Sequence, residues 1–286
     1  MRNNTSLKLF VVTLSASFIF YSCQKSIDKQ ADFNEIGSVA NSSNSKQGVT
    51  PYKFERINEH NFHSQGWKEQ QINLVPAGTI FSDQSDHVEI VCGSENNSDQ
   101  RLIQGAVTMN LPTSADPTLR RIRLRKGGYS GTLFADLTEL KYSTYVIHNA
   151  PTIMVLQVDV TNDNTKDFNI FFEPTQFSQG SGYPPVVLNT WQQWDALHGT
   201  WYYEISSISG LPEHSTIAEL VALFPNARII DTPPVGHDGE GVRFTIGGNP
   251  RPNYNNTVGY FDALIIGTKN EQLSTLYDFT CSQGNN

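Results

Sequence analysis

The chain has 286 residues, with 28 acidic side chains against 20 basic ones and a formal net charge of −8. Protein affinity for nucleic acids comes largely from Lys and Arg contacts to phosphates, and the sequence contains no long basic stripe. We therefore expect no nucleic-acid partner.

The N-terminus has the features of a targeting segment. Basic residues within the first eight positions precede an uncharged, mostly apolar run from Leu9 to Tyr21, which is too short to span a bilayer. Ser22-Cys23 follows directly, and a small residue before a cysteine is typical of a bacterial lipobox, although Phe20 and Tyr21 depart from its usual residues. We expect residues 1–22 to be removed and Cys23 to carry anchoring acyl chains. The alternative is an ordinary secretory signal with an incidental cysteine.

A polar segment separates this anchor from the folded part. Gln24 to Thr50 is rich in Ser, Asn, Lys and Gln and lacks the apolar content of a packed core. We expect residues 23–50 to form a disordered tether and residues 51–282 to form one domain. Such an arrangement predicts a bacterial outer-membrane lipoprotein that faces either the periplasm or the outside of the cell.

Short apolar or alternating runs, punctuated by Gly, Pro and Asn, recur through the domain. Together they predict an all-β, jelly-roll-like β-sandwich. A tight polar turn between two of the runs predicts a hairpin. The expected strands are 52–57, 71–75, 87–92, 106–111, 121–125, 140–146, 153–160, 168–173 (the hairpin partner of 153–160), 242–246, 260–266 and 276–279.

Two further features refine this architecture. Thr216-Ile-Ala-Glu219 matches a capping box, and the apolar residues that follow at helical spacing up to Pro225 predict one short helix. Tyr52-Lys-Phe-Glu55 and Tyr277-Asp-Phe-Thr280 look alike at the two ends of the domain. We expect these terminal strands to pair at one edge of a sheet.

The densest basic cluster is Arg120 to Lys126, in which basic and apolar residues alternate. This pattern predicts a strand with one solvated face; the alternative is a site for an anionic ligand such as an acidic glycan. Cys92 and Cys281 lie in the opening and closing parts of the domain, so an exported chain allows them to pair. Two inert thiols are the alternative.

Aromatic residues concentrate between Leu188 and Tyr203, where three of the four tryptophans lie. Trp191, Trp194 and Trp201 either fill the core or stack on a sugar ring, whose C–H face is apolar. Asp195 then accepts a sugar hydroxyl, or else anchors an indole or backbone donor. The later loop contains Arg251, Asn253 and Tyr254, which suit hydroxyl recognition, although ordinary loops have the same composition.

The loop between the two strands of the predicted hairpin is rich in oxygen donors. Asp159, Asp163 and Asp167 are candidate calcium ligands, because hard cations prefer carboxylate and amide oxygens. Asp and Asn also form tight turns through local hydrogen bonds, and this is the alternative. Apart from possible calcium, we expect no cofactor.

No catalytic signature emerges from the sequence. Gly-x-Ser-x-Gly is absent, and so is the paired-carboxylate pattern of sandwich-fold glucanases. The protein is therefore expected to be non-catalytic.

Two motifs carry a resemblance to a known kind of domain. Trp191-Gln-x-Trp194-Asp195-Ala-Leu-x-Gly199-x-Trp201 and Val258-Gly-Tyr-Phe-Asp262-Ala-Leu-x-Ile-Gly267, before Tyr277-Asp-Phe279, resemble sequences of uncharacterised secreted bacterial lipoproteins. The resemblance spans roughly Tyr52 to Phe279. It implies a jelly roll of the galactose-binding or concanavalin-like kind, with no catalytic residues to transfer.

These observations favour a binding module for glycan or another cell-envelope ligand. A structural or adhesion lipoprotein that acts through protein partners is the first alternative. A divergent carbohydrate-active enzyme is the second.

Overall fold

The computed structural model describes residues 51–73, 87–91, 105–111, 120–174, 184–203, 214–231, 241–247 and 257–281. The chain divides into two units, Met1–Thr50 and Pro51–Asn286. All described residues belong to the second unit.

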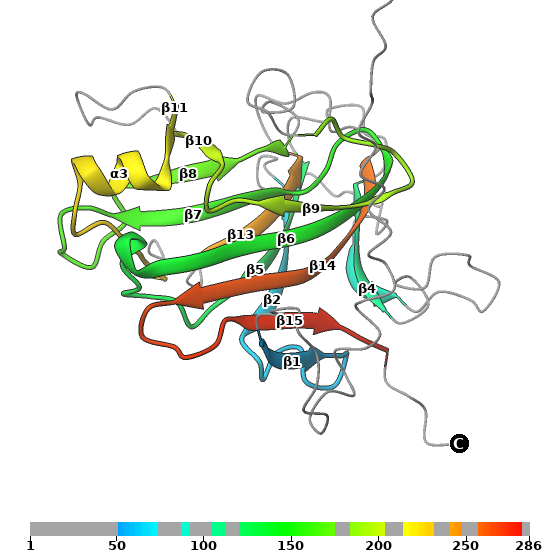
Figure 1. The fold of residues 1–286 in the computed structure, drawn as a ribbon. Coiled ribbons are helices and arrows are strands. Elements are labelled where there is room, and N and C mark those ends of the chain that lie inside the picture. Colours follow the sequence, from blue (N-terminus) through cyan, green and yellow to red (C-terminus); the bar gives the residue numbers. More distant parts are fainter. Residues whose placement is uncertain are drawn as a thin grey trace, which may run out of the picture. The chain divides into compact units, whose positions relative to one another are not determined.

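The all-β sandwich fold is confirmed: the described strands form two sheets (Figure 1). Sheet A contains β9 (Trp191–Asp195), β6 (Leu137–His148), β14 (Thr257–Thr268), β4 (Ala106–Leu111), β3 (His87–Val91), β15 (Thr275–Phe279) and β1 (Lys53–Ile57). Sheet B contains β11 (His214–Thr216), β10 (Thr200–Tyr203), β8 (Phe168–Phe172), β7 (Ile153–Asp159), β12 (Arg228–Ile229), β13 (Val242–Gly247), β5 (Arg120–Lys126) and β2 (Trp67–Asn73).

The long strand β14 organises sheet A. It pairs with β6 on one edge, while the other edge pairs first with β4 and then with β15. A bulge lies between these two halves, where Ala263 has a positive φ of 53°. There the Asp262 carboxylate accepts the backbone N–H of Phe279 at 3.0 Å. The Asp262 side chain thus takes the place of a backbone carbonyl acceptor where the partner strand of β14 changes from β4 to β15.

The predicted pairing of the terminal strands is confirmed. β1 and β15 run parallel, with Phe54 opposite Leu276 and Ile57 opposite Phe279. The hairpin of β7 and β8 is confirmed as well, with Met154 opposite Phe172.

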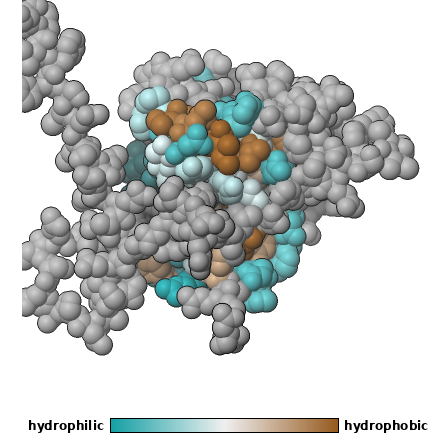
Figure 2. Space-filling model, turned by 90° about the vertical axis from the view of Figure 1, so that its right-hand side faces the viewer, coloured by the Kyte–Doolittle hydropathy of each residue, from teal (hydrophilic) through white to brown (hydrophobic). Residues whose placement is uncertain are grey.

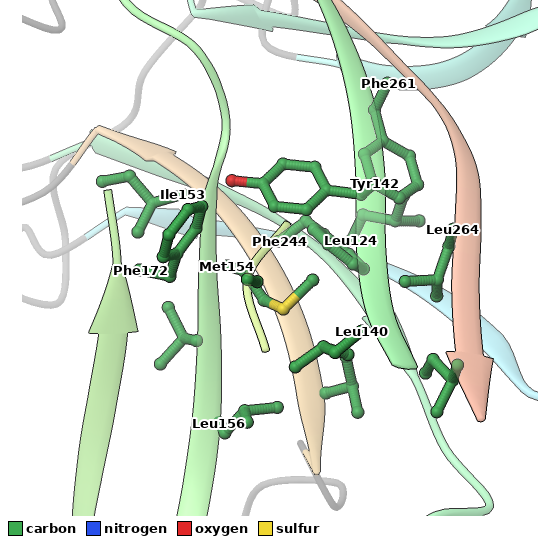
Figure 3. Packing of buried hydrophobic residues seen from close by; sticks show 14 of the residues in the cluster. Leu124, Leu140, Tyr142, Ile153, Met154, Leu156, Phe172, Phe244, Phe261 and Leu264 are labelled. Carbon is green, nitrogen blue, oxygen red and sulfur yellow. The ribbon is translucent and has the colours of Figure 1, made fainter. Parts of the chain in front are cut away.

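The core between the sheets is strongly aromatic. The Trp67 ring lies 4.9 Å from that of Phe279, 5.7 Å from that of Tyr277 and 6.3 Å from that of Phe261. Figure 3 shows Tyr142 and Phe261 from sheet A facing Phe244 and Met154 from sheet B. All these side chains are buried and belong to one hydrophobic cluster. They are the residues of each strand whose side chains point toward the other sheet.

The predicted helix is confirmed as α3 (Ile217–Leu223). Thr216 Oγ1 accepts the Glu219 backbone N–H at 3.2 Å, and the Glu219 carboxylate accepts the Thr216 N–H at 2.7 Å. Its buried residues, Ile217 and Leu220, join the core. A 3-10 turn, η3 (Phe134–Asp136), precedes β6. Among the described residues, no helix is long and apolar enough to cross a membrane.

Candidate functional site

The three clustered tryptophans do not share one environment. Trp194 is 0% exposed and its indole N–H donates to Thr144 Oγ1 at 2.8 Å. Trp201 is 1% exposed and its indole N–H donates to the Ala196 carbonyl at 2.8 Å. Both rings therefore fill the core and present no face to a ligand, so the core alternative holds for them and their candidacy as ligand-binding residues is wrong. Trp191 is partly exposed.

Strand geometry explains this division. Trp194 lies opposite Tyr142 of β6, on the face of sheet A that points into the core. Trp191 is three residues earlier in the same strand and lies opposite Tyr145. Because side chains alternate between faces, an odd spacing places the two indoles on opposite sides of the sheet. Trp191 therefore belongs to the outer face.

An aromatic row crosses this outer face, formed by Trp191, Tyr145 and Tyr260. They lie in register on the adjacent strands β9, β6 and β14, which Figure 1 shows side by side. The Trp191 and Tyr145 ring centroids are 5.7 Å apart, and those of Tyr145 and Tyr260 are 5.9 Å apart. Each ring is partly exposed, so the row presents aromatic surface to solvent.

Sequence reasoning did not single out Tyr145 or Tyr260. The period-two pattern of 140–146 signals that Tyr145 points away from the core, because Leu140, Tyr142 and Val146 are the inward residues. No equivalent signal exists for Tyr260, since the bulge in β14 shifts the phase of that strand. Only the strand order brings the three rings together.

Polar side chains form the next position along the same face. Gln193 of β9 lies opposite Ser143 of β6, and Ser143 lies opposite Asp262 of β14. Gln193 is exposed, whereas Ser143 and Asp262 are buried. Of these groups, only the Gln193 amide is exposed beside the aromatic row, and an amide is one of the groups that orient polyol ligands.

A charged group lies one position further along the sheet. Lys141 is opposite Asp195 in the ladder, and its Nζ is 2.7 Å from Glu139 Oε1, which also accepts the Tyr52 hydroxyl at 3.1 Å. Partial burial by itself lowers the pKa of Lys141, but the hydrogen bond to Glu139 and the attraction of that carboxylate outweigh burial and raise it. Asp195 accepts from His198 Nδ1 at 2.9 Å. The predicted residue Asp195 therefore lies on the outer face, at the next same-face position of β9 after Gln193.

The other predicted ligand residues, Arg251, Asn253 and Tyr254, lie outside the described residues, as does Cys23. Their roles stay predictions.

The carboxylates of the hairpin loop all accept hydrogen bonds from residues of the loop itself. Asp159 Oδ2 accepts from Arg228 at 2.8 Å, and its carboxylate also accepts the backbone N–H groups of Asn162 and Asn164. Asp163 accepts from Thr165, and Asp167 Oδ2 accepts the backbone N–H groups of the residues that follow β7. This is the turn geometry of the alternative interpretation. In the described ranges, no group of three His, Cys, Asp or Glu has a metal-binding arrangement.

The basic strand differs from its predicted environment. Arg125 and Arg243 lie opposite each other on β5 and β13, on the face of sheet B away from the core, yet they are only 6% and 3% exposed. Both make interactions within the chain. The expectation of a solvated face is therefore wrong for these positions, because the middle strands of this face are covered.

The cysteine at the end of the domain is oxidised. Cys281 is disulfide-bonded, and its two possible partners, Cys23 and Cys92, lie outside the described residues. The backbone of Gly105 packs closely against that of Cys281, since a Cβ on Gly105 would lie 2.8 Å from the Cys281 nitrogen. The neighbouring Ala106 pairs with the residue just before Cys92.

We therefore expect Cys92 to be the partner of Cys281. Proteolysis without reduction, followed by mass spectrometry, should yield one linked peptide pair that contains both residues. Recovery of both as free thiols would contradict the pairing. Cys92→Ser is the matched control, because it should release one titratable thiol at Cys281.

Comparisons with known proteins add little to this geometry. No family model and no curated protein sequence matches the chain. A solved structure described as "CBM4 structure and function" aligns with 70% of this chain and 94% of its own length, at 12% identity and a TM-score of 0.23. A likeness at this level carries no argument about function. The two-sheet topology itself agrees with the jelly roll that the sequence resemblance implied.

Proposed function

We propose that the protein is a non-catalytic glycan-binding module and that the aromatic row on the outer face of sheet A is its binding surface. One observation carries this proposal: three partly exposed aromatic side chains lie in register on neighbouring strands. A sugar ring has an apolar C–H face that packs on such rings, and its hydroxyls then meet polar side chains at the edges.

The surroundings of the row support the same ligand class. Gln193 supplies an amide at the surface, and Asp195, Lys141 and Glu139 supply charged groups further along the sheet. A mainly apolar platform with a few polar groups fixes the orientation of a ligand without needing a deep cleft. The sandwich behind the row is rigid, because the opposite faces of β9 and β6 carry the buried Trp194 and Tyr142.

We also propose that the module belongs to an envelope lipoprotein anchored through Cys23, as the apolar run and the preceding serine suggest. Anchored in this way, it would hold a polymer near the membrane. This part of the proposal is independent of the aromatic row.

A glycan array and affinity electrophoresis test the binding surface. Trp191→Ala should weaken binding by about tenfold or more, since truncating a central aromatic anchor commonly costs above about 1 kcal/mol. Tyr202→Ala is the matched control, because Tyr202 is also a partly exposed aromatic but lies in the other sheet, stacked on Phe171. It should leave affinity unchanged. Absence of any glycan signal for the wild type, or equal losses in both variants, would overturn the proposal.

A further inference from the structure

The three rings of the aromatic row are not parallel to one another. The planes of Trp191 and Tyr145 are inclined by 54°, and those of Tyr145 and Tyr260 by 62°. The ladders that hold them run without a register shift from Trp191 to Asp195 and from Gly259 to Asp262, so the three side chains share the outer face of sheet A. The row is therefore a platform whose surface turns from one strand to the next.

The inclination of the rings is fixed by the packing around them. On the opposite face of the three strands, Trp194, Tyr142 and Phe261 are fully buried in the core. The twist between neighbouring strands accounts for only about 20–25° of each angle. The rest comes from the rings themselves, because aromatic neighbours at this separation favour inclined over parallel planes.

The inclined rings restrict the shape of a bound glycan. A sugar that packs its C–H face on an aromatic ring lies parallel to that ring. Two linked sugars on neighbouring rings are therefore inclined to each other as the rings are. In a flat ribbon each unit is rotated by half a turn, so the sugar planes stay parallel and pack on only one ring of a neighbouring pair. In a chain whose units are each rotated by a third of a turn, neighbouring planes are inclined much as these rings are.

The spacing of the row matches a chain that crosses the strands. The ring centroids are 5.7 Å and 5.9 Å apart, close to the length of one sugar unit in an extended chain. Figure 2 shows the side of the molecule that lies on the right in Figure 1, where apolar and polar side chains adjoin on the described surface. A sugar unit, with apolar faces and a polar rim, has the same mixed character. The row thus accommodates three consecutive units, one on each ring.

We infer that the ligand of the aromatic row is a single β-1,4-linked chain with the three-fold twist that xylan adopts in water, and not a flat ribbon such as that of crystalline cellulose. This inference rests on the proposed glycan-binding function. It adds the conformation of the chain, which the presence of aromatic rings alone does not give.

Calorimetric titration of the full chain with xylohexaose and cellohexaose tests the inference, beside a sedimentation assay with crystalline cellulose. The wild type should bind xylohexaose about fivefold or more tightly than cellohexaose, because a flat chain loses at least one stacked contact. It should not sediment with crystalline cellulose. Tyr145→Ala removes the ring to which both others are inclined, so it should weaken xylohexaose binding and abolish the difference between the two oligosaccharides.

Tyr202→Ala is again the control, since Tyr202 lies in the other sheet, and it should keep both affinities and their ratio. Equal or tighter binding of cellohexaose, adsorption to crystalline cellulose, or a preference that persists in Tyr145→Ala overturns this inference and leaves the proposed function intact. Binding confined to other glycans of the array has the same meaning. No binding to any glycan overturns both.

Discussion

Replacing Trp67 with alanine is expected to lower the free energy of unfolding by about 3–5 kcal/mol, the range for large aromatic side chains removed from a core. Trp67 is fully buried and contacts aromatic rings from both sheets, including Phe244 of sheet B and Phe279 of sheet A. Collapse around the cavity is limited, because these rings are held by separate strands. Guanidinium denaturation monitored by circular dichroism measures the loss.

Trp67→Phe is the control for this position. It keeps an aromatic ring in the cluster and removes an indole N–H that has no hydrogen-bond partner within the described structure. The expected loss is about a third of that for alanine or less. If alanine cost under about 1 kcal/mol, Trp67 would not be the centre of the core that its contacts indicate.

Asp159→Ala is the second large expected change, with a loss of about 2–3 kcal/mol, because it removes a buried carboxylate that accepts charged and backbone hydrogen bonds. The Asp159 carboxylate is fully buried and holds Arg228 and two backbone N–H groups of its own loop. Without it, the partly buried Arg228 guanidinium and the two loop N–H groups lose their shared acceptor. Denaturant titration at neutral pH measures the effect.

The neighbouring Asp163→Ala serves as the matched control. Asp163 is exposed and accepts hydrogen bonds from Thr165 in the same loop, so its removal should cost only a small fraction of the Asp159 loss. Equal losses for the two variants would mean that the loop as a whole, rather than the buried pair, stabilises the hairpin.

The same residue gives stability an acid dependence. Burial by itself raises the pKa of Asp159, but Arg228 and the two backbone donors outweigh burial and lower it. The ionised carboxylate therefore stabilises the fold at pH values above the ordinary aspartate pKa of about 3.9. This contribution declines as pH falls through the lowered native pKa. Asp159→Asn should show a shallower loss of stability on acidification than the wild type.

Local sequence patterns predicted much of the sandwich. The runs that became β4, β7, β8 and β13 alternate or are continuously apolar, and the capping box before α3 is formed entirely by adjacent residues. Such features need no knowledge of distant parts of the chain. The pairing of β1 with β15 was also foreseeable, since the two segments share an aromatic pattern.

The strands around the candidate site were harder to predict. β9 is only five residues long and contains two glutamines and an aspartate, so its composition does not indicate a strand. Without that strand, the spacing of Trp191 and Trp194 could not be translated into opposite faces. β2 begins at Trp67, four residues before the predicted run. The predicted run began too late because Lys68 and Glu69 interrupt the apolar pattern.

The aromatic row also depends on long-range topology. Along the chain, Tyr145 lies 46 residues before Trp191 and 115 residues before Tyr260. Their approach follows from β6 pairing with both β9 and β14. No local pattern specifies this strand order.

The parallel pairing of β1 with β15 also has a mechanical consequence. In a parallel pair, the start of one strand and the end of the other lie at opposite ends of the ladder. Tension between the chain that enters β1 and the chain that leaves β15 therefore acts along the strands, and all their hydrogen bonds share the load at once. The β1–β15 pair would therefore resist a pull on the two ends of the domain by shear rather than by unzipping.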